Sequence, residues 1–525
     1  MPKQEKTVFE NLKVSALTGP SAKLNVEVLA IPVFKTANPI KTFAADLDKK
    51  LNGKLSAFCK AEKFDGDSGT QLIFSVTSGL KIKKIIVLGM GDHEKFSLHT
   101  LRKTAGHIAK VSQNQKVKSL AISIPMPEAS QYRYSAAPEE IATVLTEGLM
   151  LGCYRFTAYK TQKKNPSELK SLAIYTLDSS LEKSLAQGVR RGQIHATCTA
   201  IARDLVNEPP NRANPNYLAN YAKKLLSKTG VKVTILNPKQ IKSLGMNTYL
   251  CVSQGSDQPP ALIHLEYTPP RTKSTKRSGK GKGPFHLALI GKGVTFDSGG
   301  LSIKPAKSME TMKDDMAGGA AVIATMFGVS QIKPDVKVSG FILATENMIN
   351  GQAVRPGDVV TSYLGKTVEI LNTDAEGRLT LADALAYAQN FKPDQMIDIA
   401  TLTGACLVAL GDSISAILGN SRDLTEKVIE AGKRAGETFW EMPLFEDYRP
   451  ALKSDIADLR NIGGNYGGTI TAALFLSEFV AKSTAWAHLD IAGPAWTEKD
   501  ADFFSKGGTG VGVRTFLNYI STLNA

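Results

Sequence analysis

Short apolar runs alternate with stretches of helical spacing through the first third of the chain. The runs LNVEVLAIPVF, KIIVLGMG and SLAISIPM have the character of strands, whereas IATVLTEGLMLGCYRF has apolar residues at helical spacing. Strands that alternate with helices are typical of α/β folds. The pattern therefore predicts a small N-terminal α/β domain over residues 1–180.

A longer stretch of helical spacing follows, in SLEKSLAQGVRRGQIHATCTAIARDLV, and the prolines of NEPPNRANP end it. We expect a connecting helix over residues 181–205. Beyond it come further strand-like runs (KVTIL, ALIHLEY, FHLALIG, KVSGFILAT, TVEIL, QMIDIATL, TAWAHLDIA), several separated by helical segments such as TMKDDMAGGAAVIATMFGVS and LTLADALAYAQNF. This predicts a larger C-terminal domain over residues 206–525, with a central, mostly parallel sheet flanked by helices.

Composition excludes several classes of protein. The chain has 525 residues, 42% of them apolar, and a formal net charge of +15, so whole-chain disorder, collagen and coiled coil are ruled out. Its five cysteines are scattered without CxxC spacing, which supports neither a cysteine zinc site nor a disulfide framework and fits a reducing compartment. No apolar window is long enough to span a membrane, and the N-terminus lacks an apolar signal segment. We therefore expect a cytoplasmic protein without a membrane partner.

Positive charge is concentrated in RTKSTKRSGKGKG, at residues 271–283. A solvated surface loop is the ordinary interpretation of such a stretch, and a contact for nucleic acid or another polyanion is the alternative. The segment has no interleaved aromatic residues and no nucleic-acid fold signature accompanies it. Nucleic acid is therefore not an expected partner.

Charged side chains gather after the strand-like runs FHLALI and TVEIL and at the start of one helical stretch. They are Lys292, Asp297, Lys304, Asp315, Asp374, Glu376 and Arg378. Ligand sites in open α/β sheets lie beyond the carboxyl ends of the strands, so these side chains mark a candidate site. If NTDAEGRL is extended, its three charged residues at i, i+2 and i+4 share one face.

Four of these residues are carboxylates, whose charge two divalent cations would balance. Carboxylate oxygens suit Mg²⁺, Mn²⁺ or Zn²⁺, and two ions side by side lower the pKa of a water between them. Solvent-facing salt bridges and acidic residues at helix starts would explain the same spacing. From these residues alone, a two-metal site and an ordinary charged surface both stay open. Phosphate-loop, nucleophile-elbow and histidine zinc-protease motifs are absent, and Phe296 takes the third glycine position of a dinucleotide fingerprint.

Four long motifs carry a family resemblance. GKGVTFDSGGLSIKP, MKDDMAGGAAV, NTDAEGRLTLADAL and TLTGA resemble, in the same order, the leucyl aminopeptidase family of dimetal exopeptidases, the cytosol aminopeptidases. The resemblance is strong from about residue 195 to the end and weak over the first 180 residues. Glu310 and Ala317 depart from the family pattern at positions that are not ligands, and residues 271–283 look like an insertion.

The resemblance implies a metal-dependent aminopeptidase that releases N-terminal Leu and other hydrophobic amino acids from peptides, using a hydroxide bridged by two metals. Two divalent ions per subunit are implied, Zn²⁺ with an exchangeable site that also takes Mn²⁺ or Co²⁺. Asp297 and Glu376 would bridge the ions, with Lys292 and Asp315 completing one site and Asp374 the other. Lys304 would donate to the substrate carbonyl, and Arg378 would hold a bicarbonate that acts as general base.

The resemblance also implies a pocket for the first side chain and an assembly. The pocket would be lined by Met312, Thr401, Gly404, Ala492 and Ala495. Because Ala495 stands where a larger methionine can occur, we expect a roomy pocket that accepts Leu, Met and Phe. Family members assemble as homohexamers, which this sequence does not show independently.

Two other functions remain as alternatives. A two-metal phosphohydrolase would use a similar carboxylate-rich centre. A nucleic-acid-binding role would run through the basic insertion at 271–283. A scaffold that has lost catalysis is disfavoured because the carboxylates, both lysines and Arg378 are all present.

Overall fold

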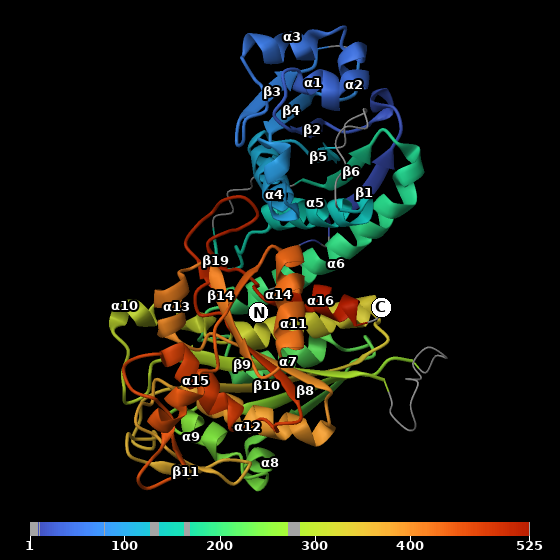
Figure 1. Ribbon diagram of the computed structural model, residues 1–525. Coiled ribbons are helices and arrows are strands. Elements are labelled where there is room, and N and C mark those ends of the chain that lie inside the picture. Colours follow the sequence, from blue (N-terminus) through green and yellow to red (C-terminus); the bar gives the residue numbers. More distant parts are fainter. Residues whose placement is uncertain are drawn as a thin grey trace. The chain divides into compact units, whose positions relative to one another are not determined.

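The computed structural model (Figure 1) describes residues 9, 11–77, 79–125, 136–161, 169–270 and 284–523. The chain divides into two compact units, and the basic stretch at 271–283 lies outside the described residues. Unit 1 comprises Met1–Ala200 with Lys499–Ser505, and unit 2 comprises Ile201–Glu498 with Lys506–Ala525. The division falls inside helix α6 (Glu182–Asn207), and a short segment near the C-terminus returns to unit 1.

Unit 1 is built around a sheet in the order β1-β6-β5-β2-β4-β3, in which only the β3–β4 pair is antiparallel among the described strands. The strands are β1 (Lys13–Thr18), β2 (Val28–Val33), β3 (Gln71–Ser75), β4 (Lys84–Gly89), β5 (Ser119–Ser123) and β6 (Ser171–Thr176). One face packs against α1 (Pro39–Phe43), α2 (Ala45–Lys50) and α3 (Lys54–Ala61), and the other against α4 (Leu98–Asn114), α5 (Pro138–Cys153) and α6. Alternate strand residues such as Val28 and Leu29 therefore enter different cores.

A buried ion pair with a hydrogen-bonded histidine joins three helices of unit 1. Glu147 of α5 lies 2.6 Å from Nε of Arg102 on α4 and 2.7 Å from Nδ1 of His195 on α6, and all three side chains are almost fully buried. Breaking such a pair leaves an uncompensated buried charge, so it fixes how the helices pack.

Unit 2 contains a larger mixed sheet in the order β15-β14-β17-β13-β9-β10-β8-β7. Its strands are β7 (Lys232–Leu236), β8 (Ala261–Tyr267), β9 (His286–Asp297), β10 (Lys337–Asn347), β13 (Gln395–Ala400), β14 (Ile414–Gly419), β15 (Thr438–Glu441) and β17 (Ala485–Asp490). The central strands β17, β13, β9 and β10 run parallel, and antiparallel pairs flank them. The predicted α/β fold, with a smaller N-terminal and a larger C-terminal domain around a mostly parallel sheet, is confirmed.

Helices cover both faces of this sheet (Figure 1). One face packs against α9 (Asn247–Ser253), α12 (Glu376–Ala388) and α15 (Gly468–Ser477), and the other against α11 (Ala317–Ile332), which contacts α16 (Val513–Thr522), itself packed on α14 (Arg422–Ala435). A Cβ at Gly318 of α11 would lie 2.0 Å from the carbonyl oxygen of Ile399 in β13. This glycine lets α11 approach the sheet at the level where the charged side chains gather.

The segment TVEIL does not join the main sheet, contrary to the expectation from its sequence. It forms β12 (Thr367–Glu369) in a small separate sheet with β11 (Val359–Thr361) and β16 (Leu459–Arg460). The turn at residues 362–366 folds β12 back antiparallel on β11, so the main-chain groups of β12 are paired in this small sheet. Other short elements are α7 (Pro215–Leu225), α8 (Pro238–Ser243), α10 (Ala306–Met309), α13 (Gly404–Leu410), β18 (Trp496–Thr497) and β19 (Gly507–Gly508). Within the described ranges, no helix is long and apolar enough to cross a membrane.

We predict that His264 of β8 destabilises unit 2 in acid. Burial lowers its pKa to about 4, against an ordinary value of 6.5, and its ring stacks on Phe341 at a centroid distance of 4.5 Å. Below about pH 6.5 His264 binds a proton in the unfolded chain but not in the folded chain. The stability that the neutral His264 contributes to unit 2 is therefore fully present above about pH 6.5 and is lost as the pH falls toward about 4. His264→Phe keeps the stacked ring and should therefore lose less melting temperature than the parent between about pH 7 and about pH 4.5.

The measurement is thermal unfolding across this pH range, with His107→Gln in unit 1 as a control that keeps His264. His286, a neighbour of His264, remains in all three proteins, and burial lowers its pKa to about 4 as well. An equal acid-induced loss of melting temperature in His264→Phe and the parent would contradict the prediction.

Candidate metal centre

Strand β9 carries two of the charged residues within its length. The sequence placed Lys292 in a loop after a shorter strand, but pairing with β10 continues from His286 to Asp297. Val294 pairs with Thr345 and Phe296 with Glu346, so Thr295 is an extra residue in β9, a β-bulge. Because the bulge interrupts the alternation of side chains, Asp297 lies on the same face as Lys292. Both side chains are buried, with 3% and 2% exposed.

The segment NTDAEGRL is not extended, which corrects the expectation that its charged residues share a strand face. Asp374 lies in a turn, and helix α12 begins at Glu376, so Glu376 and Arg378 sit in its first turn. The turn follows the small sheet rather than a neighbouring strand of the main one. At Gly377 a Cβ would lie 2.7 Å from the Nζ of Lys292, so this glycine lets α12 pack directly on the lysine.

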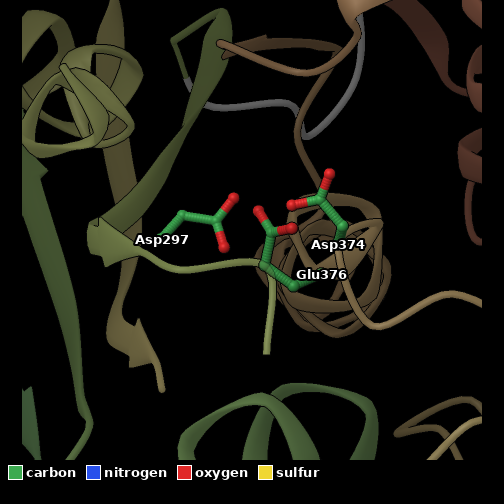
Figure 2. Close-up of side chains that lie close together, drawn as sticks. All are labelled: Asp297, Asp374 and Glu376. Carbon is green, nitrogen blue, oxygen red and sulfur yellow. The ribbon is translucent and has the colours of Figure 1, made fainter. Parts of the chain in front are cut away.

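Three carboxylates converge at this point. Figure 2 shows Asp297 from the end of β9 pointing toward Asp374 and Glu376 at the start of α12, and their ligand atoms all lie within 4.8 Å of one another. The Nζ of Lys304 lies 2.9 Å from Oδ2 of Asp297 and 2.6 Å from Oδ1 of Asp374. The structure therefore brings Lys304 to the same cluster.

Asp315 lies beside this cluster, in the turn that precedes α11. The Nζ of Lys292 is 2.8 Å from Oδ1 of Asp315 and 2.7 Å from Oε1 of Glu376, and it donates to the carbonyl oxygen of Thr401 over 2.9 Å. The hydroxyl of Thr401 donates to the same Asp315 oxygen over 2.8 Å. All five residues that the sequence proposed as metal ligands thus belong to one contiguous group.

The electrostatics of the group are those of a buried excess of negative charge. Burial raises the pKa of Asp297 and of Asp315, and the neighbouring Glu376 carboxylate raises both further. Burial alone would lower the pKa of Lys292, but the charges of Asp315, Glu376 and Asp297 outweigh it and hold that pKa above its usual value. Two ammonium groups face four carboxylates, so the cluster is short of positive charge.

Divalent cations fit this donor set. Oδ2 of Asp315 is buried and has no hydrogen-bond partner among the described residues. Carboxylate oxygens together with one amine nitrogen suit Zn²⁺ or Mn²⁺, and two ions would balance the carboxylates once Lys292 binds as a neutral amine. Such binding releases a proton from the lysine, which adjacent dications favour.

Arg378 lies deeper at the start of α12, with 8% of its surface exposed. Its NH1 donates to the carbonyl oxygen of Asn461 over 2.8 Å, whereas its buried Nε finds no partner in the described part of the chain. Burial lowers the pKa of Arg378 to about 10, and the nearby Glu376 and Asp490 partly offset this. A guanidinium with an unused buried donor fits a small anion.

The residues proposed for the substrate pocket come from several elements. They are Met312 in the short 3₁₀ helix Met312–Asp314, Thr401 after β13, Gly404 at the start of α13, and Ala492 and Ala495 after β17. The loop after β13 and the loop after β17 are joined by Asp490. Its Oδ1 accepts hydrogen bonds from the main-chain N–H groups of Leu402, Thr403 and Ala492. Gly404 is exposed with open space around its Cβ position, whereas Ala495 is only 1% exposed.

Sequence reasoning missed three residues that support the cluster. Nδ2 of Asn347 donates to Oδ1 of Asp297 over 2.8 Å and to the carbonyl oxygen of Thr373 over 3.0 Å. Asn347 and Asp490 each end a central strand, so the rule on strand carboxyl ends could have found them. Asn461 follows a strand of two residues and gave no such signal.

Both units match known family models. Residues 200–517 match the catalytic domain of the cytosol aminopeptidase family, and residues 30–163 match its N-terminal domain. The chain is 42% identical over 498 residues to a probable cytosol aminopeptidase of Aquifex aeolicus, covering 94% of this chain and 96% of that one. It is 43% identical over 477 residues to a probable cytosol aminopeptidase of Picosynechococcus sp., covering 90% and 92%.

Solved structures share the fold over nearly the whole chain. A mutant of tomato leucine aminopeptidase superposes with a TM-score of 0.83 at 35% identity, covering 97% of this chain and 96% of that one. The bottromycin maturation enzyme BotP in complex with Mn gives a TM-score of 0.82 at 31% identity, covering 95% and 100%. The similarity therefore includes both units.

We predict that Asp315→Asn weakens the binding of one of two divalent ions. The amide removes a charged ligand, so affinity should fall by more than the ~10–100-fold that the loss of an outer partner typically costs. Asp314 is the matched control, because it is the neighbouring buried aspartate and burial raises its pKa to about 7, which makes a neutral amide tolerable there. Metal stoichiometry and affinity would be measured by titration against a competing chelator. Equal losses in Asp315→Asn and Asp314→Asn would contradict the assignment.

Proposed function

The chain belongs to the cytosol aminopeptidase family, and from this premise we propose which of its residues carry the reaction and which peptides it cleaves. The protein is a metal-dependent aminopeptidase, a hydrolase that removes amino acids from the N-terminus of peptides. The observation that carries the assignment of the reacting centre is the convergence of Asp297, Asp374 and Glu376 within 4.8 Å, beside the Lys292–Asp315 pair.

We assign the metal ligands by position in the cluster. Asp297 and Glu376 lie between the two lysines and would be shared by both ions, because each contacts one lysine and each approaches Asp374. Lys292 and Asp315 would complete one site and Asp374 the other. When bound, the ions would supply Lewis acidity and lower the pKa of the attacking water. Zn²⁺, with Mn²⁺ or Co²⁺ in the exchangeable site, fits the donors, and the similar BotP structure is a complex with Mn.

Lys304 is the group best placed to meet the substrate. Its side chain is 15% exposed while Asp297 and Asp374 hold its ammonium group, so its Nζ is both fixed and reachable. Donation from Nζ to the scissile carbonyl oxygen strengthens as that oxygen gains negative charge. A preorganised donor of this kind is typically worth ~2.7–4 kcal/mol of transition-state stabilisation.

Arg378 would hold a bicarbonate ion, which supplies the general base. The unused buried Nε of Arg378 supports this assignment. A separate base is needed because the cluster's carboxylates are committed to ions and lysines. Held by Arg378, the anion would accept a proton from the water and pass it to the leaving amine.

We also infer a homohexamer in the cytosol that acts on peptide substrates. Unit 2 exposes large apolar side chains, among them Ile303, Val408, Trp440, Ile456 and Tyr466. Exposed apolar side chains are buried again where subunits meet, so these residues are the candidates for such contacts. The names of the relatives support the cytosol, as do cysteines that are all free.

We predict that the protein hydrolyses a leucine amide reporter at about pH 8, that a chelator abolishes this activity, and that Zn²⁺ or Mn²⁺ restores it. The reason is that removal of the ions leaves the carboxylates paired only with lysines, with no Lewis acid for the carbonyl. A phosphate monoester serves as the control substrate and should not be cleaved. Activity that persists in chelator, or phosphate release without amide cleavage, would overturn the proposed function.

We predict that Gly404→Val narrows the pocket for the first side chain. A Cβ at Gly404 meets nothing within 4 Å, so added bulk occupies open space without disturbing the fold. Specificity of kcat/KM for Leu, Met and Phe amides over Ala amide should fall by about 10-fold or more, the effect of one or two methylene groups. Gly351→Val is the matched control, since its Cβ position is also open. An unchanged preference in Gly404→Val would remove Gly404 from the pocket.

A further inference from the structure

Asn461 is a fully buried residue outside the recognised motifs. Among the described residues, its side chain forms hydrogen bonds only with main-chain groups. Its Oδ1 accepts from the N–H of Leu371 over 2.9 Å and of Asn372 over 3.3 Å. Its Nδ2 donates to the carbonyl oxygen of Asn372 over 2.7 Å. The side-chain amide thus acts like one more residue of a paired strand, beyond the point where β12 and β16 stop pairing.

The segment held in this way leads directly to Asp374. Oδ1 of Asn372 accepts from the N–H of Asp374 over 2.8 Å, so the residue clamped by Asn461 in turn fixes the turn that carries the carboxylate. On its other side, this turn is held by Thr373, whose hydroxyl donates to the carbonyl oxygen of Gly299 over 2.7 Å. Asn347 and Ser302 also bond Thr373, so Asn461 is one of several supports of the Asp374 turn, and it holds the turn from the side of Asn372.

The same residue also holds Arg378. The carbonyl oxygen of Asn461 accepts from NH1 of Arg378, and the N–H of Asn461 donates to the carbonyl oxygen of Glu369 over 2.9 Å. The side-chain bonds and this main-chain bond together fix the direction of the carbonyl. The hydrogen bond from NH1 to that carbonyl restrains the Arg378 guanidinium, which also carries the unused Nε.

We propose that Asn461 is a positioning residue that sets the Asp374 metal ligand and the Arg378 anion site together. A residue that merely completed the small sheet would need only its main chain, which already bonds to Glu369. The side-chain amide instead reaches past the sheet to the turn before Asp374. This inference rests on the roles proposed above for Asp374 and Arg378, and it adds a residue that couples them.

The test compares Asn461→Ala with Asn420→Ala in the full-length protein. Asn420 is exposed, unlike Asn461, and serves as the control for the loss of main-chain bonds alone. Its amide accepts from Trp486 N–H over 2.8 Å and donates to the Thr484 carbonyl over 3.0 Å, with no bond to the cluster. Two readouts besides turnover separate positioning from stability. They are the affinity for Mn²⁺ measured against a chelator and the bicarbonate concentration for half-maximal rate in carbonate-depleted buffer.

We expect Asn461→Ala to lower kcat with little change in KM, to weaken Mn²⁺ binding, and to raise the half-maximal bicarbonate concentration, each by ~10–100-fold. Asn420→Ala should leave both binding readouts at the parent values. Asn461→Asp is the second variant, because it keeps the volume and the acceptor oxygen but has no N–H for Asn372. It should show the same losses, which keeps the test open if the alanine variant does not fold.

Parent-like Mn²⁺ and bicarbonate binding in a folded Asn461 variant would overturn the inference while leaving the proposed function intact. Losses in Asn461→Ala matched by Asn420→Ala would also overturn it, since they would reflect stability alone. Arg378→Ala tests separately whether Arg378 holds the anion at all. If that variant keeps the parent response to bicarbonate, the anion assignment under the proposed function is wrong, and the coupling built on it falls as well.

Discussion

The repulsion between carboxylates buried in one place is the constraint on which the site depends. Asp297, Asp315 and Glu376 are each almost fully buried. Burial and the Glu376 carboxylate raise the pKa of Asp297 and of Asp315, and Asp297 adds to the effect on Asp315. Lys292 and Lys304 relieve part of this repulsion through short contacts, but two ammonium groups do not neutralise four carboxylates. A cluster built only for stability would be balanced internally, because an unpaired buried charge is costly. The remaining negative charge is therefore what a site for cations requires.

The backbone meets this constraint with two local irregularities. The bulge at Thr295 turns Asp297 onto the face that Lys292 already occupies, which regular alternation along β9 would forbid. The turn before α12 delivers Asp374 and Glu376 from the opposite direction, and Gly377 lets the helix start against the lysine side chain. Both irregularities sit where a regular strand or an uninterrupted helix would keep the charges apart. The regular sheet supplies the rigid frame, and the departures from it build the site.

The sequence predicted the fold class and the identities of the clustered residues because these depend on local pattern and on motif. Apolar periodicity located β9, β10 and β13, and the charged motifs named every member of the cluster. The conformation of the end of β9 was predicted wrongly, because apolar periodicity does not reveal a bulge. TVEIL was assigned to the main sheet because strand propensity does not specify which strand it pairs with. NTDAEGRL shows the same limit, because three charges at alternating positions also fit a turn that enters a helix.

The residues that sequence reasoning missed share one physical property. Asn347 and Asn461 bond to main-chain groups of the segment that carries Asp374. Asp490 bonds to the segment that begins with Thr401, which contacts the cluster. Because the carboxylates of the cluster repel one another, their charges cannot hold the segments that carry them in place. The buried main-chain N–H and carbonyl groups of these loops also need hydrogen-bond partners. One buried side chain can satisfy both needs, so supports of this kind are to be found by accounting for main-chain hydrogen bonds around the site. Motifs do not reveal them, since the bonded segments lie about ninety residues apart in the case of Asn461 and Asp490.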